Sequence, residues 1–176
     1  MAGRAAGGRA GAHRKRQRSQ STTSTRPIQQ PDLSTMTSAI PMYGPPITLA
    51  LALRVIDRAH REALAHGWQM VFAVVDSTDH LVALHRMDGV HHASIRVAQG
   101  KASTAVNFKR PTKVFEDAVA AGGAGVRLLA LEGMVPMEGG IPLLQDGRIV
   151  GAIGVSGVQS TEDGLAAQAG AAVTNG

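Results

Sequence analysis

The chain has 176 residues, no cysteine and a hydrophobic content of 44%, which suits one domain with an aliphatic core and excludes disulfides, thiolate metal sites and a cysteine nucleophile. Residues 1–31 hold seven of the 18 Lys and Arg residues and none of the 13 Asp and Glu residues, which leaves 11 basic against 13 acidic residues, a net charge of −2, for the remainder. The formal charge of +5 therefore belongs to an N-terminal arm, and the domain lacks the excess of basic residues expected of a specific nucleic-acid binder.

The arm comprises residues 1–46, is rich in Gly, Ala, Ser, Thr, Arg and Pro, and is predicted to be disordered because it has little apolar surface to bury. It has no apolar stretch that suits a secretory signal, but its Arg- and Ser-rich, acid-free composition fits an organellar transit peptide. The basic cluster at 14–18 also suits non-specific contact with nucleic acid. A third interpretation gives the arm no role, with translation starting at Met36. On that interpretation we expect a cytoplasmic protein whose domain spans 47–176.

The first predicted element is a helix from Thr48 to His66, with Thr48 as its N-cap and Gly67 as the glycine that ends it. Its apolar positions fall on one face at helical spacing; they are Leu49, Leu53, Ile56, His60, Ala63 and Leu64. An imidazole in such a stripe is usually a core or interface residue, but a helix also presents an axial haem ligand in this way. His60 is therefore a candidate ligand of haem iron.

Two apolar runs, 70–75 and 81–87, follow as strands of a hairpin, because turn-forming residues separate them and Asp88-Gly89 ends the second. A helix at about 92–108 comes next. Its apolar face is built mostly of small side chains and should pack close to the sheet; it consists of Ile95, Ala98, Ala102, Ala105 and Val106. Lys101 and Thr104 are predicted to point away from that face. Pro111 opens a third helix, and the glycine-rich run 122–125 ends it.

A second hairpin occupies residues 138–157, where Asp146-Gly147 joins two apolar runs and is a strong signal for a tight turn. Glycine weakens a strand, so the several glycines of this hairpin indicate that a ligand or a packed helix approaches its backbone. A last helix is predicted from about Thr161 to Val173. The order α-β-β-α-α-β-β-α predicts an α+β fold with helices packed on a largely antiparallel sheet.

The remaining motifs give weaker signals. The adjacent His91 and His92, with His85 nearby, lack the spacing of a zinc site. The glycine clusters lack the lysine and the context of a phosphate-binding loop, and Ser156 lies in a Gly-Val-Ser-Gly sequence that is typical of a strand end and not of a nucleophile elbow. Charges beside elements that should otherwise be buried often meet at the rim of a pocket, although solvated ion pairs are the common alternative; these charges are Arg86, Asp88, Lys101 and Glu138.

From about Ile47 to its C-terminus the chain resembles the GlcG/HbpS family, the haem-degrading or haem-binding family that is related to the PduO C-terminal domain. The motifs that carry the resemblance are Ala73-Val74-Val75-Asp76, Arg86-Met87-Asp88-Gly89, Gly100-Lys101-Ala102, Arg110-Pro111-Thr112 and the glycine-rich hairpin. The resemblance implies a profilin-like fold on a five-stranded antiparallel sheet, the missing strand lying near Leu128–Leu131. It also implies homo-oligomers, haem as a cofactor of some members, and accessory roles in catabolic operons for others.

Three functions remain open. The first is a haem- or small-ligand-binding oligomer that uses His60. The second is a small-molecule enzyme of a catabolic pathway, such as a hydrolase, deaminase or isomerase, in which Arg86 and Lys101 hold a substrate carboxylate and Glu138 moves a proton if burial raises its pKa. The third is an accessory subunit without chemistry. Further ligand contacts are predicted at Asp88, Thr104, Gly139, Gly140 and Ser156. The partners expected are a small molecule and further copies of the chain, with no membrane and no specific nucleic acid.

Overall fold

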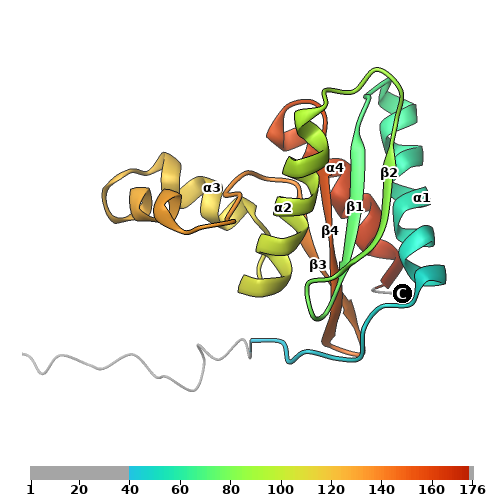
Figure 1. Ribbon diagram of the computed structural model, residues 1–176, viewed down its shortest axis with the longest axis horizontal. Helices are drawn as coiled ribbons and strands as arrows, with labels where there is room; N and C mark the ends of the chain where they lie inside the picture. The colour runs from blue at the N-terminus through green and yellow to red at the C-terminus, as the bar shows by residue number, and fades with distance from the viewer. Residues whose placement is uncertain (1–39, 175–176) are drawn as a thin grey trace, which may run out of the picture. The chain divides into compact units, whose positions relative to one another are not determined.

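A computed structural model describes residues 40–174 and has the α+β architecture that the element order predicts, with a four-stranded antiparallel sheet of order β2-β1-β4-β3 (Figure 1). The elements are, in chain order, α1 (Leu49–His66), β1 (Val71–Asp76), β2 (Leu81–Arg86), α2 (Ala93–Phe108), α3 (Lys113–Ala120), the 3₁₀ helix η1 (Gly123–Ala130), β3 (Gly140–Gln145), β4 (Arg148–Ser156), α4 (Ser160–Ala171) and the 3₁₀ helix η2 (Ala172–Thr174). The predictions for residues 1–39, including the start at Met36, lie outside the described residues.

The prediction of a fifth antiparallel strand is wrong. Residues 128–130 belong to η1, which begins at two glycines of positive φ, with Gly122 before its first residue Gly123, and Leu131 ends it. An additional pairing comes instead from residues 42–44, where Tyr43 forms a parallel bridge with Ile149. There the N–H of Gly44 donates to the carbonyl of Ile149 at 2.8 Å. This segment, which the sequence analysis assigned to the arm, hydrogen-bonds to β4 beyond its last pair with β1.

Helices cover both faces of the sheet. On one face α1 and α4 enclose the largest apolar cluster, which includes Phe72 of β1 and Ile153 of β4. On the other face α2 lies across β1 and β4, while α3 and η1 project away from the sheet (Figure 1). None of the helices in residues 40–174 has the length and apolar character that crossing a bilayer would require.

The first helix begins and ends as predicted. The Thr48 side chain accepts a hydrogen bond from the N–H of Leu51, and Gly67 takes the left-handed conformation at the end of the helix. The buried face, however, is displaced from the predicted stripe: it consists of Ala52, Val55, Ile56, Ala59 and Ala63. Alanines therefore lie against the sheet, while Leu49 and Leu64 are more than half exposed. This displacement puts His60 at the margin of the buried face.

The two glycines that face each other across the β3–β4 pair, Gly140 and Gly154, explain how closely α2 approaches the sheet. A side chain at Gly154 would overlap the carbonyl oxygen of Ala98, and one at Gly140 would overlap the carbonyl oxygen of Lys101. Both glycines thus let the helix backbone rest on the strands. The glycine-rich hairpin accommodates a packed helix here, which was one of its two expected explanations.

Lys101 and Thr104, which are predicted to point away from the apolar stripe of α2, are not exposed, because α2 is enclosed on more than one side. Both residues are buried. The hydroxyl oxygen of Thr104 accepts the N–H of Val135 at 2.9 Å, so the chain segment before β3 covers a second side of the helix. An apolar stripe identifies the side that meets the sheet, but it does not exclude a second covered side.

Candidate functional site

The cleft that the structure offers to a ligand lies between α1 and the edge strand β2 and has a volume of about 640 Å³. It is referred to below as the α1–β2 cleft and is lined by His60, Gln69, Phe72, Leu84, His85, Arg86, Met87 and Asp88. A second hollow, of about 560 Å³, lies around Leu51 and Arg54 near the start of α1, and none of the predicted site residues lines it. The α1–β2 cleft contains three of them.

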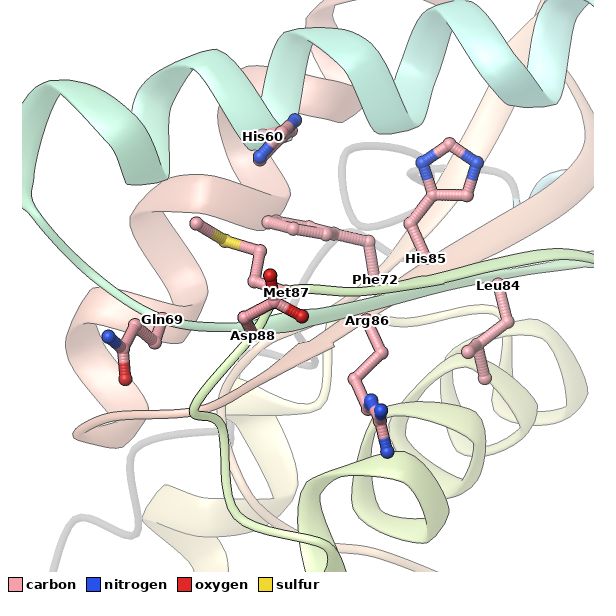
Figure 2. A pocket seen from close by; sticks show the side chains of 8 residues that line it. All are labelled: His60, Gln69, Phe72, Leu84, His85, Arg86, Met87 and Asp88. Carbon is pink, nitrogen blue, oxygen red and sulfur yellow. The ribbon is translucent and has the colours of Figure 1, made fainter.

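The strand pairing decides which side chains face each other in the cleft. Phe72 of β1 is paired with His85 of β2, so both lie on the α1 face of the sheet, whereas Leu84 and Arg86 lie on the α2 face. Figure 2 shows this division: His60 and His85 lie on the side of α1, and Arg86 extends from the other side of the same strand. The cleft therefore wraps around the β2 edge of the sheet and receives side chains from both faces.

His60 reaches the cleft because it lies at the margin of the buried face of α1. Its ring packs on Phe72, with the ring centroids 5.7 Å apart and the planes tilted by 59°. Neither His60 nor His85 has a hydrogen-bond or ion-pair partner within the described residues. The cleft thus contains two imidazoles whose nitrogens are not used by the fold.

The Arg86-Met87-Asp88-Gly89 motif holds the end of β2 in place. The N–H of Met87 donates to the carbonyl of Met70 at 3.0 Å, and the N–H of Met70 approaches the Met87 sulfur at 3.4 Å. Gly89 follows in the left-handed conformation, which a side chain would strain. These contacts fix the backbone on which Arg86 and Asp88 stand at the rim of the cleft, so the rim contains one cation and one anion.

Lys101, a predicted substrate-binding residue, lies elsewhere. Its side chain is 1% exposed, and its ammonium is 2.7 Å from the Asp163 carboxylate and 3.0 Å from the carbonyl oxygen of Val155. We call this contact between α2, β4 and α4 the Lys101 seam. Burial raises the pKa of Asp163, and the Lys101 ammonium opposes that rise. The arrangement joins three elements and leaves Lys101 no access to the α1–β2 cleft.

Glu138 also lies away from the cleft, before β3 and against α4. Its carboxylate packs on Gly164, where a side chain would overlap it, and it borders a small cavity of about 20 Å³ that Lys113 and Gln168 also line. Its Oε2 atom is buried and has no hydrogen-bond partner within the described residues. Burial raises the pKa of Glu138, while the Lys113 ammonium lowers it. Arg86 and Glu138 therefore line different cavities.

Of the five predicted ligand contacts, only Asp88 lines the α1–β2 cleft. The others take part in the packing of α2, β3 and β4. The N–H of Gly140 donates to the Thr112 hydroxyl at 2.8 Å, the carbonyl of Gly139 accepts the N–H of Val155 at 2.8 Å, and Ser156 is buried at the end of β4. Thr104 is likewise buried against Val135.

His85 is the residue of the cleft that sequence reasoning missed as a ligand candidate. It was weighed only together with His91 and His92, as part of a zinc cluster. The signal that identifies it is alternation along the second strand: position 85 lies on the same face as position 83 and opposite to Arg86. Assigning that face to α1 required knowing which helix covers it, which depends on the tertiary fold.

The fold and these motifs define the class of protein. Residues 47–172 match the model of the family described as haem degrading protein HbpS-like. The chain belongs to this family, which confirms the resemblance drawn from its motifs.

Two proteins illustrate how similar other sequences are to this chain. Protein GlcG of Escherichia coli K12 is 37% identical over 106 residues, which cover 60% of this chain and 78% of GlcG. An uncharacterised 15.0 kDa protein from the dhaT-dhaS intergenic region of Citrobacter freundii is 33% identical over 124 residues, covering 69% of this chain and 87% of that protein.

Solved structures are similar as well. The ORFY protein of Klebsiella pneumoniae superposes with a TM-score of 0.69 at 28% identity, covering 76% of this chain and 94% of that one. A double mutant of Streptomyces reticuli HbpS gives 0.68 at 31% identity, covering 75% and 89%. The PduOC:heme complex gives 0.67 at 27% identity, covering 74% and 96%. These similarities place the chain in a haem-related binding family.

Proposed function

We propose that this protein binds haem in the α1–β2 cleft, with His60 as an axial ligand of the iron. The observation that carries the proposal is an imidazole at the margin of the buried face of α1 that lines an open cleft, packs on Phe72 and has no hydrogen-bond partner in residues 40–174. A helix-borne histidine of this kind is a common proximal ligand. The family and the PduOC:heme complex support the choice of haem over other planar ligands.

The residues of the cleft fit the group. Haem needs an apolar surface for its macrocycle; the partly exposed Met87 contributes one beside His60, and Phe72, which also lines the cleft, is itself buried. It also carries two propionates, and the Arg86 guanidinium at the rim is a suitable charged donor for a carboxylate. Asp88 at the same rim opposes a second propionate nearby. Bound haem would supply an iron centre whose chemistry depends on its axial ligands.

A hemin titration of the full chain tests the proposal. The expected result is a shift of the Soret band that saturates at one haem per chain, with binding weakened or the band altered in His60→Ala. His66→Ala is the matched control, because His66 lies on the same helix outside the cleft and stacks on Trp68. The absence of any Soret shift in the wild-type protein would refute haem binding. An unchanged spectrum in His60→Ala would refute His60 as the ligand.

A second candidate function is proton transfer to or from a small substrate at Glu138. A buried carboxylate oxygen without a partner and a raised pKa are typical of general acids and bases. Because Arg86 and Lys101 do not line this cavity, Lys113 is the cation beside Glu138, and a substrate carboxylate would have to compete with Asp117, with which Lys113 is paired. Glu138→Gln should abolish turnover of such a substrate while leaving the fold intact; undiminished turnover would exclude Glu138 from the chemistry.

We also propose that the protein is a homo-oligomer. The edge of β2 pairs with no other strand in the described chain, and the projecting α3–η1 segment exposes Val114, Val126 and Leu129. Exposed strand edges and apolar side chains are common features of subunit interfaces. Sedimentation velocity over a range of concentrations should give a mass above that of one chain, and a single monomeric species would refute this proposal.

A further inference from the structure

We infer that a second cavity, on the α2 face of the sheet, binds a short zwitterion, with Arg96 holding its carboxylate and Asp79 its ammonium group. The cavity has a volume of about 380 Å³. It is referred to below as the α2–turn cavity and is lined by Val75, Asp79, Leu81, Arg96, Gln99, Gly100, Ser103 and Gly133. None of these residues lines the α1–β2 cleft, so the inference does not depend on haem binding.

Helix α2 forms one wall of this cavity. Its lining residues occupy positions i, i+3, i+4 and i+7, starting at Arg96 and ending at Ser103, and so lie on one side of the helix. At a rise of about 1.5 Å per residue, these two residues are roughly 10 Å apart along the helix axis. Val75 and Leu81, which are cross-strand partners, supply the apolar part of the lining. The cavity therefore extends along two turns of α2 with an apolar surface beside it.

Asp79 is held at the Ser103 end of the cavity. Its φ of 68° is left-handed, a conformation that aspartate tolerates in turns. Its Oδ2 atom accepts the Ser103 hydroxyl at 2.7 Å and the Asn107 side-chain amide at 2.7 Å, both of which are neutral donors. Its Oδ1 atom accepts no hydrogen bond from residues 40–174. The fold thus positions this carboxylate without neutralising its charge.

Arg96 lies toward the other end of the cavity. Its side chain is exposed and forms no ion pair within the described part of the chain. Arg96 and Asp79 therefore line one cavity as opposite charges that do not reach each other. A guanidinium presents paired N–H groups that match a carboxylate, and the Gln99 amide, one turn along α2, adds a donor beside it.

The two charges select the ligand. A dianion would be repelled by Asp79, and a diamine by Arg96, because each would bring a like charge to one end of the cavity. A zwitterion whose charges are separated by a short apolar chain satisfies both ends, and its chain can pack on Val75 and Leu81. Glycine cannot do this, because its two charges are adjacent. The volume also suits a small organic ligand.

The test is a calorimetric titration of the full chain with 5-aminopentanoate, which carries an ammonium and a carboxylate at opposite ends of an apolar chain. Saturable binding is expected in the millimolar range. Pentanoate, pentylamine and glycine are the matched ligands, and each should bind about tenfold or more weakly, because each lacks one charge or the separation between them.

Two variants test the residues. Asp79→Asn keeps the tolerance for a left-handed backbone and an oxygen that accepts the Ser103 hydroxyl, but removes the charge. Arg96→Gln removes the other charge at an exposed position. Each should weaken binding of 5-aminopentanoate by about tenfold or more. The controls are Asp146→Asn, at another left-handed aspartate, and Arg127→Gln, at an exposed arginine of η1; both should bind as the wild type does.

The outcomes are separate from those of the hemin titration. Absence of saturable 5-aminopentanoate binding would overturn the inference, as would equal binding of pentanoate or pentylamine, or an unchanged affinity in Asp79→Asn or Arg96→Gln. Far-UV circular dichroism identical to that of the wild type shows that a variant is folded. A protein that binds 5-aminopentanoate as expected but gives no Soret shift would refute haem binding alone.

Discussion

The α1–β2 cleft and the Lys101 seam both contain titratable side chains, but these side chains have opposite surroundings. In the seam the ammonium and the carboxylate are buried, lie 2.7 Å apart and hold α2 and α4 together at the end of β4. In the cleft His60 of α1 and His85 of the edge strand β2 line an open surface, and the side chain of neither has a polar partner in residues 40–174. The seam uses its charges to build the fold, whereas the cleft keeps its polar groups available.

The difference shows that burial of a charged group does not by itself mark a functional site. Lys101 is the most buried charged residue among the described lysines and arginines, yet its hydrogen bonds end on groups of the fold. The unpaired imidazoles of the cleft belong to residues that are only partly buried or exposed, and Glu138 has one buried oxygen without a partner in the described residues. A search for function in this chain therefore depends more on missing partners than on buried charge.

The largest expected loss of stability comes from breaking the Lys101 seam. Lys101→Ala leaves the Asp163 carboxylate buried without its cation and should cost about 3–5 kcal/mol of unfolding free energy. Urea unfolding followed by circular dichroism measures it. Replacing both residues, as in Lys101→Met with Asp163→Leu, should recover much of this loss, because no buried charge remains. A loss below about 1 kcal/mol for Lys101→Ala would show that the seam does not stabilise the fold.

In the cleft, a bound ligand should raise the unfolding free energy, whereas shortening a side chain should change it little. Hemin at 100 times its dissociation constant should raise the unfolding free energy by about 2.7 kcal/mol, because it binds only the native state. His60→Ala should reduce that gain while costing the ligand-free protein only about 1 kcal/mol, since its ring packs on Phe72 but makes no hydrogen bond. Thermal unfolding with and without hemin checks both points. A large loss of stability in ligand-free His60→Ala would remove the contrast with the seam.

Close packing between helix and sheet gives a third test. Gly154→Ala should destabilise the protein by roughly 1–3 kcal/mol, because the new Cβ meets the backbone of α2 and must push it from the sheet. Gly67→Ala is the comparison: no atom lies near a Cβ there, so only the left-handed backbone opposes it, at about 1 kcal/mol. If the two variants unfold at the same denaturant concentration, α2 is not held in close contact with β4.

The smallest expected effect is the pH dependence due to Glu138. Because its pKa is raised in the folded protein, the native state favours the protonated carboxyl. Relative to Glu138→Gln, the wild-type protein should be most stable below the ordinary glutamate pKa of 4.5 and should lose that advantage as the pH rises through the raised value. Unfolding free energies of both proteins across this range give the difference. If the wild-type protein instead gained stability relative to Glu138→Gln as the pH rises, the burial of Glu138 would be contradicted.

The limits of α1 followed from local signals, because Thr48 and Gly67 cap a helix through contacts within one turn. The two hairpins followed from their turn residues in the same way. The prediction of the buried face of α1 was wrong by part of a turn. The leucines suggested one stripe, whereas the residues that meet the sheet are mostly alanines on a neighbouring stripe. The sides of α2 that hold Lys101 and Thr104 depend on the segment before β3 and on α4, and contacts of that range leave no periodic pattern in the sequence.

The residues of the candidate site also fall into those that the sequence identified correctly and those that it did not. Arg86 and Asp88 were named from the sequence as charges beside elements that should otherwise be buried, and His60 as an imidazole in an apolar helix stripe, and all three line one cleft. Lys101 and Glu138 were named on the same grounds but lie in other places. A strand-end charge can be recognised from its position in the chain, whereas the cavity it enters depends on which helices cover each face of the sheet.

The missing partners of His60 and His85 have a consequence for how such a protein can change over generations. A substitution at either position breaks no hydrogen bond in the described structure, so it uses up little of the small stability margin that limits which mutations a protein tolerates. Substitutions in the Lys101 seam or at the facing glycines Gly140 and Gly154 should instead destabilise the fold. New ligands can therefore be acquired along the edge of β2 while the rest of the domain stays as it is.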